Sequence, residues 1–446
     1  MATTNIYGNG LNSTAGANTV VHYYDRAGIK AANAVNVYGQ FVSRKDMPTK
    51  MGKTFKISKF LHMYDRALND AEFATKGFMT SRTADEVSAA LTNASLSEGA
   101  GAVNKRSLQK VTVETTLARY GEMIDYTDEV DLFSEDYIQV KYREELGELA
   151  NSRMEDLIQL DMLGTPTKMY SGIGVSLNTV GDGIASDGSE DGDWRVSFDL
   201  IRKAVRKLTR NRAKKNTTIV TGSTKIDTKV VAKSYYGIID ADIKTDLENL
   251  TRGSSYEKEF VFQPVEKYGD AAKLAEGEVG AMYQVRFIEA ERAVNYAGKG
   301  ASVPGDYNGS LSYTADAASL VFRNLGSSAV NITGVIATNP YGTSVAAGAV
   351  VTATTAAHAT ALAGVAGLTR DIGKFDVHTI LFPTEGSFAT VGLKGQGKIK
   401  FNSKDPASVE NVNPYGTTGF FSYNFFYGGI ILEPEKLLAV YCGVSK

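Results

Sequence analysis

The sequence predicts an α+β fold, in which one long helix stands between segments that alternate like β-strands. The first observation is an apolar stripe at helical spacing over residues 134–161. The second is the strand-like character of residues 53–59 and of the aromatic tail 414–446. The third is a long polar excursion over residues 92–107, a feature that is unusual inside a compact domain and is often functional.

The N-terminal segment is expected to be a basic arm. Apolar residues at roughly helical spacing predict a helix over 18–42, and Pro48 and Gly52 separate it from the strand at 53–59. Because this segment has little apolar surface, it is not expected to fold alone.

A long hairpin is expected over 66–120. Alternation from Val111 to Thr115 indicates its second strand, and the polar stretch 92–107 forms its tip. The sheet is expected to bend or bulge near Gly121.

The long helix is expected to begin at Ser134. Ser134 is a candidate N-cap, and Glu135 and Asp136 suit the positive end of the helix dipole. Gly164 and Pro166 end the helix. Its expected apolar stripe consists of Tyr137, Val140, Leu146, Leu149, Met154, Leu157 and Leu160.

A second amphipathic helix is expected over 198–215, with Ser197 as its cap. Its core-facing residues are expected to be Leu200, Ile201, Ala204, Val205 and Leu208. The elements expected after it are a buried strand at 219–222, a helix over 233–250, strands near 258–263 and 281–289, and a Gly/Ala/Ser/Thr-rich insertion at 298–370.

Charge is segregated along the chain. Residues 122–161 carry thirteen acidic and three basic side chains, a net of −10, while residues 195–233 carry twelve basic and two acidic ones, a net of +10. The whole chain has 48 basic and 50 acidic residues. Complementary faces of this kind attract copies of the same chain, whereas a general nucleic-acid binder has a net basic balance. The basic helix remains a candidate for phosphate contact.

The candidate assembly residues form three groups. The hairpin tip contributes Glu98, Lys105 and Arg106, because a stretch with so few apolar residues needs another subunit to order it. The acidic helix contributes Glu144, Glu145, Glu148 and Asp156. The basic helix contributes Arg202, Lys203, Arg206, Lys207 and Arg210.

Residue types that carry chemistry are sparse. Cys442 is the one cysteine, lies in an apolar strand, and is expected to be a buried packing residue. The sequence contains no GxSxG, HExxH or CxxC motif, no signal peptide and no run of 18 apolar residues. We therefore expect no catalytic, cofactor-binding or metal-binding residues, no cofactor and no membrane contact.

One glycine-rich segment fits part of a P-loop. Residues 392–398 supply the first seven positions, but Ile399 stands where a hydroxyl must reach Mg²⁺. A strand-like pattern follows where a P-loop needs a helix. A flexible glycine turn is the preferred interpretation, and a nucleotide-hydrolysing enzyme is kept as an alternative.

Residues 187–192 resemble the first half of a calcium loop. The twelfth position, however, is Phe198 and not a bidentate Glu. A solvated acidic loop is therefore the preferred interpretation.

Several segments resemble major capsid proteins of podophages of the Schitoviridae type. The central one is AEGEVGAMYQVRFIEA at 275–290. LSEG at 96–99 and RYGEMIDYTD at 119–128 precede it. Asp405-Pro406, YGTTGFFSYNFFYG at 415–428 and ILEP at 431–434 follow it, in the family's order. The ordered set covers most of the chain outside 298–370.

The resemblance implies an HK97-type capsid fold. Its parts would be an N-terminal arm at 1–58, an extended hairpin loop and the start of the peripheral domain at 59–130, and a spine helix at 131–165. An axial domain at 166–297, the β-rich insertion at 298–370 and return strands at 371–446 would complete it.

The resemblance also implies the function and the partners. The chain would be the major capsid protein of a tailed phage, assembling as hexamers and pentamers into an icosahedral shell around double-stranded DNA. A portal protein, a separate scaffolding protein and a decoration protein are the implied partners, with assembly in the bacterial cytoplasm. An encapsulin-like compartment that loads a cargo enzyme would share the fold and is kept as a second alternative.

Overall fold

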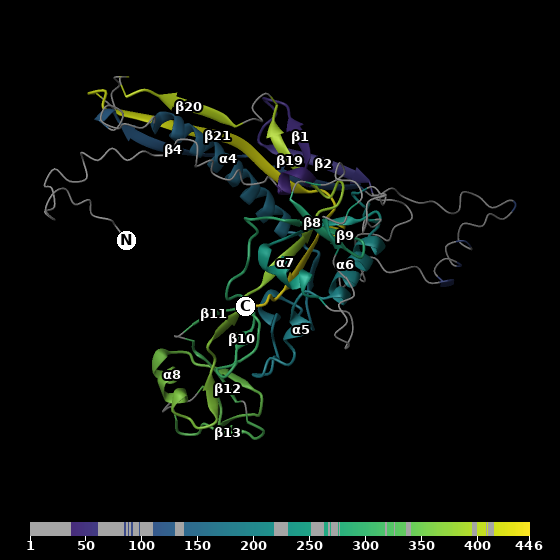
Figure 1. Ribbon diagram of the computed structural model, residues 1–446, viewed down its shortest axis with the longest axis vertical. Helices are drawn as coiled ribbons and strands as arrows, with labels where there is room; N and C mark the ends of the chain where they lie inside the picture. Colours follow the sequence, from purple (N-terminus) through teal and green to yellow (C-terminus); the bar gives the residue numbers. More distant parts are fainter. Residues whose placement is uncertain are drawn as a thin grey trace, which may run out of the picture. The chain divides into compact units, whose positions relative to one another are not determined.

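The computed structural model describes residues 37–60, 84–85, 88, 91, 98, 110–129, 138–217, 231–250, 263–265, 268, 275, 277–316, 319–324, 326–335, 340–394, 399–406, 408 and 414–446 (Figure 1). The chain divides into residues 1–34 and 35–446, and every described residue lies in the second part. Among the described residues, no helix is long and apolar enough to cross a membrane.

Two larger sheets organise the described chain. The five-stranded sheet contains β1 (Ser43–Met47), β19 (Phe388–Leu393), β21 (Thr418–Ile431), β20 (Lys400–Lys404) and β4 (Ala118–Thr127). The seven-stranded sheet contains, in spatial order, β5 (Lys168–Tyr170), β22 (Leu438–Cys442), β18 (His378–Phe382), β6 (Tyr235–Ile239), β9 (Val285–Glu289), β8 (Glu278–Met282) and β7 (Gln263–Pro264).

The long helix α4 (Ile138–Leu163) packs along β21 (Figure 1). Its buried apolar residues are Leu146, Ala150, Ile158, Met162 and Leu163. The predicted end is confirmed, because the helix stops before Gly164. The expected start at Ser134 and Tyr137 lies outside the described residues. The prediction for Leu160 was wrong: it is 55% exposed, since it lies two residues from Ile158 and therefore on the far face of the helix.

Strand β4 pairs with β21 over ten consecutive residues, from Ala118 opposite Tyr427 to Thr127 opposite Thr418. The predicted bulge near Gly121 is therefore wrong. A side chain at Gly121 would collide with the carbonyl oxygen of Tyr423. Glycine is thus required here by close backbone approach and not by a break in the ladder.

The expected hairpin is present with an earlier first strand. Strand β2 (Thr54–Phe60) pairs with β3 (Lys110–Thr116) along its full length, which confirms the strand predicted at 53–59 and the alternation from Val111 to Thr115. One face of the hairpin packs on the five-stranded sheet through Phe55, Ile57 and Val113. The hairpin therefore starts at β2 and not at residue 66.

Only residues 37–58 of the expected arm are among the described residues. Most of the helix predicted over 18–42 lies outside the described residues. Its last residues form a 3₁₀ turn, η1 (Tyr38–Phe41), and then enter β1, a strand that the sequence analysis did not predict.

Helix α6 (Phe198–Arg210) begins where it was predicted, with the Ser197 hydroxyl accepting the Leu200 N–H at 3.2 Å. It ends at Arg210, five residues earlier than expected. All five predicted core residues are buried: Leu200, Ile201, Ala204, Val205 and Leu208.

The prediction of a helix over 233–250 was wrong for the first half of this segment. Residues Tyr235–Ile239 form the central strand β6, and only Ala241–Glu248 form a helix, α7, capped by Asp240. A short apolar run that is buried between two neighbouring strands does not show helical or strand periodicity, so the sequence pattern could not separate the two. The strand expected at 219–222 lies outside the described residues. The one near 281–289 is present as the β8–β9 hairpin.

The insertion is built from short strands and one helix. It contains β10 (Ser302–Val303), β11 (Tyr313–Ala315), β12 (Val321–Asn324), β13 (Val330–Asn331), β14 (Ser344–Val345), β15 (Val350–Thr352), α8 (Ala356–Ala363) and β16 (Leu368–Arg370), followed by β17 (Gly373–Phe375). Its apolar residues divide into two groups. Residues 320–368 form a separate core, whereas Ala301, Val303, Tyr307 and Leu311 belong to the main core. The independent unit therefore begins near residue 319 and not at 298.

Three short helical turns with described bounds connect these parts: η2 (Leu177–Thr179), α5 (Asp191–Trp194) and η5 (Pro434–Lys436).

Candidate assembly surfaces

The acidic region of the chain divides into an inner and an outer part. Several of its carboxylates are used within the chain: Glu122 accepts from Arg153 at 3.0 Å, and Asp156 lies 3.7 Å from Arg153 and 3.8 Å from Arg292. Glu144 and Glu145 are exposed on α4, and Glu148 is half-buried. Three of the four predicted acidic residues thus form an outer acidic patch, and Asp156 belongs to an intramolecular ion-pair network.

Two carboxylates on the inner side of α4 hold other elements in place. Glu155 accepts the Tyr38 backbone N–H at 2.7 Å and the Gly39 N–H at 3.0 Å, which ties η1 to α4. Asp161 accepts the Tyr427 hydroxyl at 2.8 Å. Burial raises the pKa of both carboxyl groups above their ordinary values, although these hydrogen bonds oppose the shift.

The basic residues of α6 line an open groove of about 580 Å³. The groove contains Arg202, Lys203, Arg206 and Arg210 together with Asp199 and Tyr283. Lys207 points elsewhere, because its Nζ donates to the Lys168 carbonyl at 3.0 Å, and burial lowers its pKa. Four of the five predicted basic residues therefore share one concave surface, which we call the α6 groove.

Tyr283 is the residue of this groove that the sequence analysis missed. It lies in the turn between β8 and β9 with φ of 56°, the left-handed region that a bulky side chain rarely adopts. Its side chain is 51% exposed and meets Phe198 edge-on, with ring centroids 5.9 Å apart. Arg202 in turn lies over the Phe198 ring at 5.8 Å. The two-residue gap between the apolar runs 278–282 and 285–289 was the available sequence signal for this turn.

Of the three candidate residues at the hairpin tip, one is among the described residues. Glu98 is exposed in a turn, while Lys105 and Arg106 lie outside the described residues.

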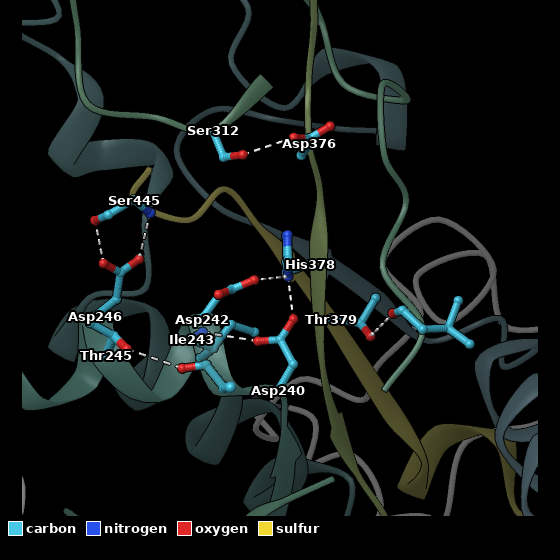
Figure 2. A network of polar contacts seen from close by, with 12 residues as sticks. Asp240, Asp242, Ile243, Thr245, Asp246, Ser312, Asp376, His378, Thr379 and Ser445 are labelled. Carbon is cyan, nitrogen blue, oxygen red and sulfur yellow. Dashed lines mark hydrogen bonds and ion pairs between the residues drawn. The ribbon is translucent and has the colours of Figure 1, made fainter. Parts of the chain in front are cut away.

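A polar network surrounds His378, the first residue of β18 (Figure 2). The His378 ring is buried, and its Nδ1 contacts Asp240 and lies 4.0 Å from Asp242 at the start of α7. Burial by itself would lower the pKa of His378, but the hydrogen bond to Asp240 and the surrounding carboxylates raise it above its ordinary value. The arrangement is a buried ion pair that fixes α7 against β18.

Among the described residues, the side chains of Asp240, Asp242 and His378 form one group whose ligand atoms are close enough to bind a metal cation. The ligand atoms of Asp240, Asp242 and His378 lie within 4.8 Å of one another. Asp240 also accepts the Ile243 N–H at 2.9 Å as the cap of α7, so its role in the fold is complete without a metal. Sequence reasoning missed this group because His378 lies more than 130 positions from the two aspartates.

The structure also decides the roles of three residues or segments singled out in the sequence. Strand β20 follows the glycine turn 392–398, whose last four residues lie outside the described part, so a strand stands where a P-loop needs a helix. Asp191 is buried rather than solvated, and it accepts from the Tyr307 hydroxyl at 2.9 Å and the Ser310 N–H at 2.5 Å. Cys442 is fully buried in β22, as predicted.

Comparison with known proteins gives one relative and a consistent fold. No family model matches the chain. The major capsid protein of Pseudomonas phage KPP21 is 23% identical over 447 residues, covering 97% of this chain and 94% of that protein. The capsid of Ralstonia phage GP4 matches with a TM-score of 0.52 at 9% identity, covering 98% of each chain. The capsid of cyanophage P-SCSP1u gives a TM-score of 0.47 at 10% identity, covering 97% and 96%.

The GP4 match agrees with the fold described above. The GP4 match establishes the fold, and the KPP21 match runs nearly from end to end, including the insertion. The resemblance to phage major capsid proteins is therefore confirmed along almost the whole chain, which has the α+β, HK97-type fold of a phage capsid subunit.

Proposed function

We propose that this chain is the major capsid protein of a tailed phage, a structural subunit that assembles into the closed shell around the phage genome. The observation that carries the proposal is the alignment with the KPP21 major capsid protein over 97% of the chain. The chain contributes surfaces to this work and not an active site.

The described surfaces suit repeated contact between identical subunits. The base of the β2–β3 hairpin is fixed on the five-stranded sheet, so a rigid element carries residues 61–109, which connect its two strands. The acidic patch on α4 and the α6 groove offer opposite charges on the same chain. Contacts between such surfaces recur in every subunit of a symmetric shell, so small energies per contact add up.

The finer parts of the proposal rest on the sequence resemblance. Hexamers and pentamers would form the shell, and a portal protein, a scaffolding protein and a decoration protein would join it. Double-stranded DNA would be packaged by non-specific contact, and assembly would take place in the bacterial cytoplasm. The podophage subtype and the division into arm, peripheral and axial domains belong to the same proposal.

Two alternative functions have less support. An encapsulin-like compartment would need a groove that recognises a cargo peptide, and two grooves lined by described residues are basic and open. A nucleotide-hydrolysing enzyme would need a phosphate-binding helix after residue 398, where the chain forms β20.

Rate-zonal sedimentation of the expressed protein, followed by negative-stain microscopy, distinguishes these functions. The proposal predicts fast-sedimenting, large closed shells. Small cages of uniform size that co-purify with an enzyme would favour the encapsulin alternative, and protein that stays at the monomer position under all assembly conditions would contradict the proposal.

A further inference from the structure

We propose that the α6 groove receives the acidic patch of α4, formed by Glu144, Glu145 and Glu148, from a second copy of this chain. The inference rests on the proposed function, because it names one of the contacts through which the shell would form.

The groove is a fixed surface. The inner face of α6 is locked by its five buried apolar residues, and the Ser197 cap fixes the first turn. The opposite face must therefore present its basic side chains in a set direction. Tyr283 closes one side of the groove from the β8–β9 turn, in a backbone conformation that costs energy for a non-glycine residue.

The charges of the groove are not balanced within the described chain. Among the ion pairs between described residues, its four cations take part in one, between Arg202 and Asp199 at 3.5 Å. Arg202, Arg206 and Arg210 lie at successive four-residue intervals along the helix, and like charges at this spacing destabilise a helix. An anionic partner removes this repulsion.

The acidic patch has the matching spacing. Glu144 and Glu148 are four residues apart on α4, and Glu145 lies beside them. Side chains at this interval stand about 5–6 Å apart on one helix face, which is the interval between Arg202 and Arg206. Two helices with complementary i, i+4 charges can therefore pair several carboxylates with several cations at once.

Packaged DNA is the alternative partner, and two observations favour protein. Tyr283 offers a half-exposed ring, which suits the aliphatic stems of glutamate side chains. The chain also carries its own acidic region, of the same size and opposite sign as the basic one. DNA binding is therefore treated as an outcome of the test.

The test is a charge reversal with its complement. We would prepare R206E, E145R and the double variant R206E/E145R, with K299E as the matched control, because Lys299 is exposed and lies outside the groove. Nuclease-treated subunits would be assembled at low salt and followed by light scattering. Thermal unfolding of unassembled subunits would confirm that each variant folds.

The inference predicts that R206E and E145R each slow assembly at least tenfold, that the double variant recovers most of the rate, and that K299E behaves like wild type. Raising NaCl should also slow wild-type assembly more than assembly of R206E. Equal rates for R206E and K299E, or a double variant slower than either single variant, would overturn it.

Two results separate this inference from other failures. If R206E assembles normally without DNA but packages or retains less of it, the groove binds DNA and the inference is wrong. If wild-type protein forms no shells even when it is co-expressed with its scaffolding protein, the proposed function fails, irrespective of the charge variants.

Discussion

The Arg323 guanidinium lies 3.7 Å from the Asp371 carboxylate, and the two side chains are 12% and 0% exposed. The pair stands where the insertion joins the main body, because Asp371 donates its backbone N–H to the Val321 carbonyl while Ile372 donates to Val303. At this separation the attraction is weak relative to the cost of burying the carboxylate. Burial therefore raises the pKa of Asp371 to about 6, even though Arg323 opposes the shift.

This pair predicts that acidification stabilises the insertion. Because the pKa of folded Asp371 exceeds its ordinary value of 3.8, the folded chain binds the proton more tightly than the unfolded chain. The stabilisation is complete below about pH 4 and is lost as the pH rises through about 6, and its size is roughly 2–3 kcal/mol. Chemical unfolding of wild type and D371N between pH 4.5 and 7.5 measures it. Wild type should gain stability relative to D371N as the pH falls, and a constant difference would show that the carboxyl has an ordinary pKa.

Deleting the insertion between residues 317 and 371, the boundaries that the structure indicates, should leave a subunit that still folds and assembles. Strands β11 and β17 pair with Ala315 opposite Gly373, and Asp316 donates its N–H to Ile372. A two-residue Asn-Gly turn in place of residues 317–371 would therefore close a hairpin. We expect this variant to form closed shells, measured by sedimentation and microscopy.

A wider deletion is the control for this experiment. Replacing 298–370 also removes Val303, Tyr307 and Leu311 from the main core, and each buried side chain of this size contributes about 1.5–3 kcal/mol. That variant should be insoluble or unfolded. If the narrow deletion aggregates as well, the insertion is part of a required interface.

The hairpin tip is predicted to contact a neighbouring subunit. The double variant K105E/R106E should leave the unfolding free energy of the isolated subunit within about 0.5 kcal/mol of wild type, because the sequence predicts a polar tip here and substitutions at such positions usually cost little. Its yield of closed shells should fall sharply, because every subunit repeats the same repulsion. K56E is the control at the base of the same hairpin, where Lys56 forms an exposed ion pair with Glu114 at 2.8 Å. A wild-type yield from K105E/R106E would mean that the tip makes no such contact.

A second buried pair lies in the segment that carried the sequence resemblance. Glu278 and Arg286 are fully buried, with Nε and Oε1 3.3 Å apart, and Arg286 also lies over the Tyr268 ring. R286M leaves a buried carboxylate without its cation and should cost about 3–5 kcal/mol in urea unfolding. E278L/R286M should recover most of this loss, because an apolar pair needs no compensation. Additive costs in the double variant would show that the two charges act independently.

The sequence predicted those features that depend on local pattern. The buried face of α6, its Ser197 cap, the end of α4 at Gly164 and the hairpin strands all follow from periodicity and end signals within a few residues. The four cations of the α6 groove were predicted in the same way, because all four lie on one helix. The groove itself was not predicted.

The features that were missed depend on partners far away in sequence. Leu160 fits the helical spacing of the apolar stripe and was predicted to face the core. Its exposure instead depends on which face of α4 packs against β21. Gly121 looked like a bulge, and it is instead fixed by the backbone of Tyr423. Tyr283 in the groove and His378 beside Asp240 are likewise brought to their places by the seven-stranded sheet, which no local pattern encodes.

Copies of this chain should form a closed shell, and the decisive experiment is a cryo-electron microscopy reconstruction of the assembled purified protein. We expect icosahedral particles whose shell density is accounted for by repeated copies of this fold, with the α6 groove of one copy facing α4 of another. Particles without closed symmetry, or a shell whose density does not fit this chain, would contradict it.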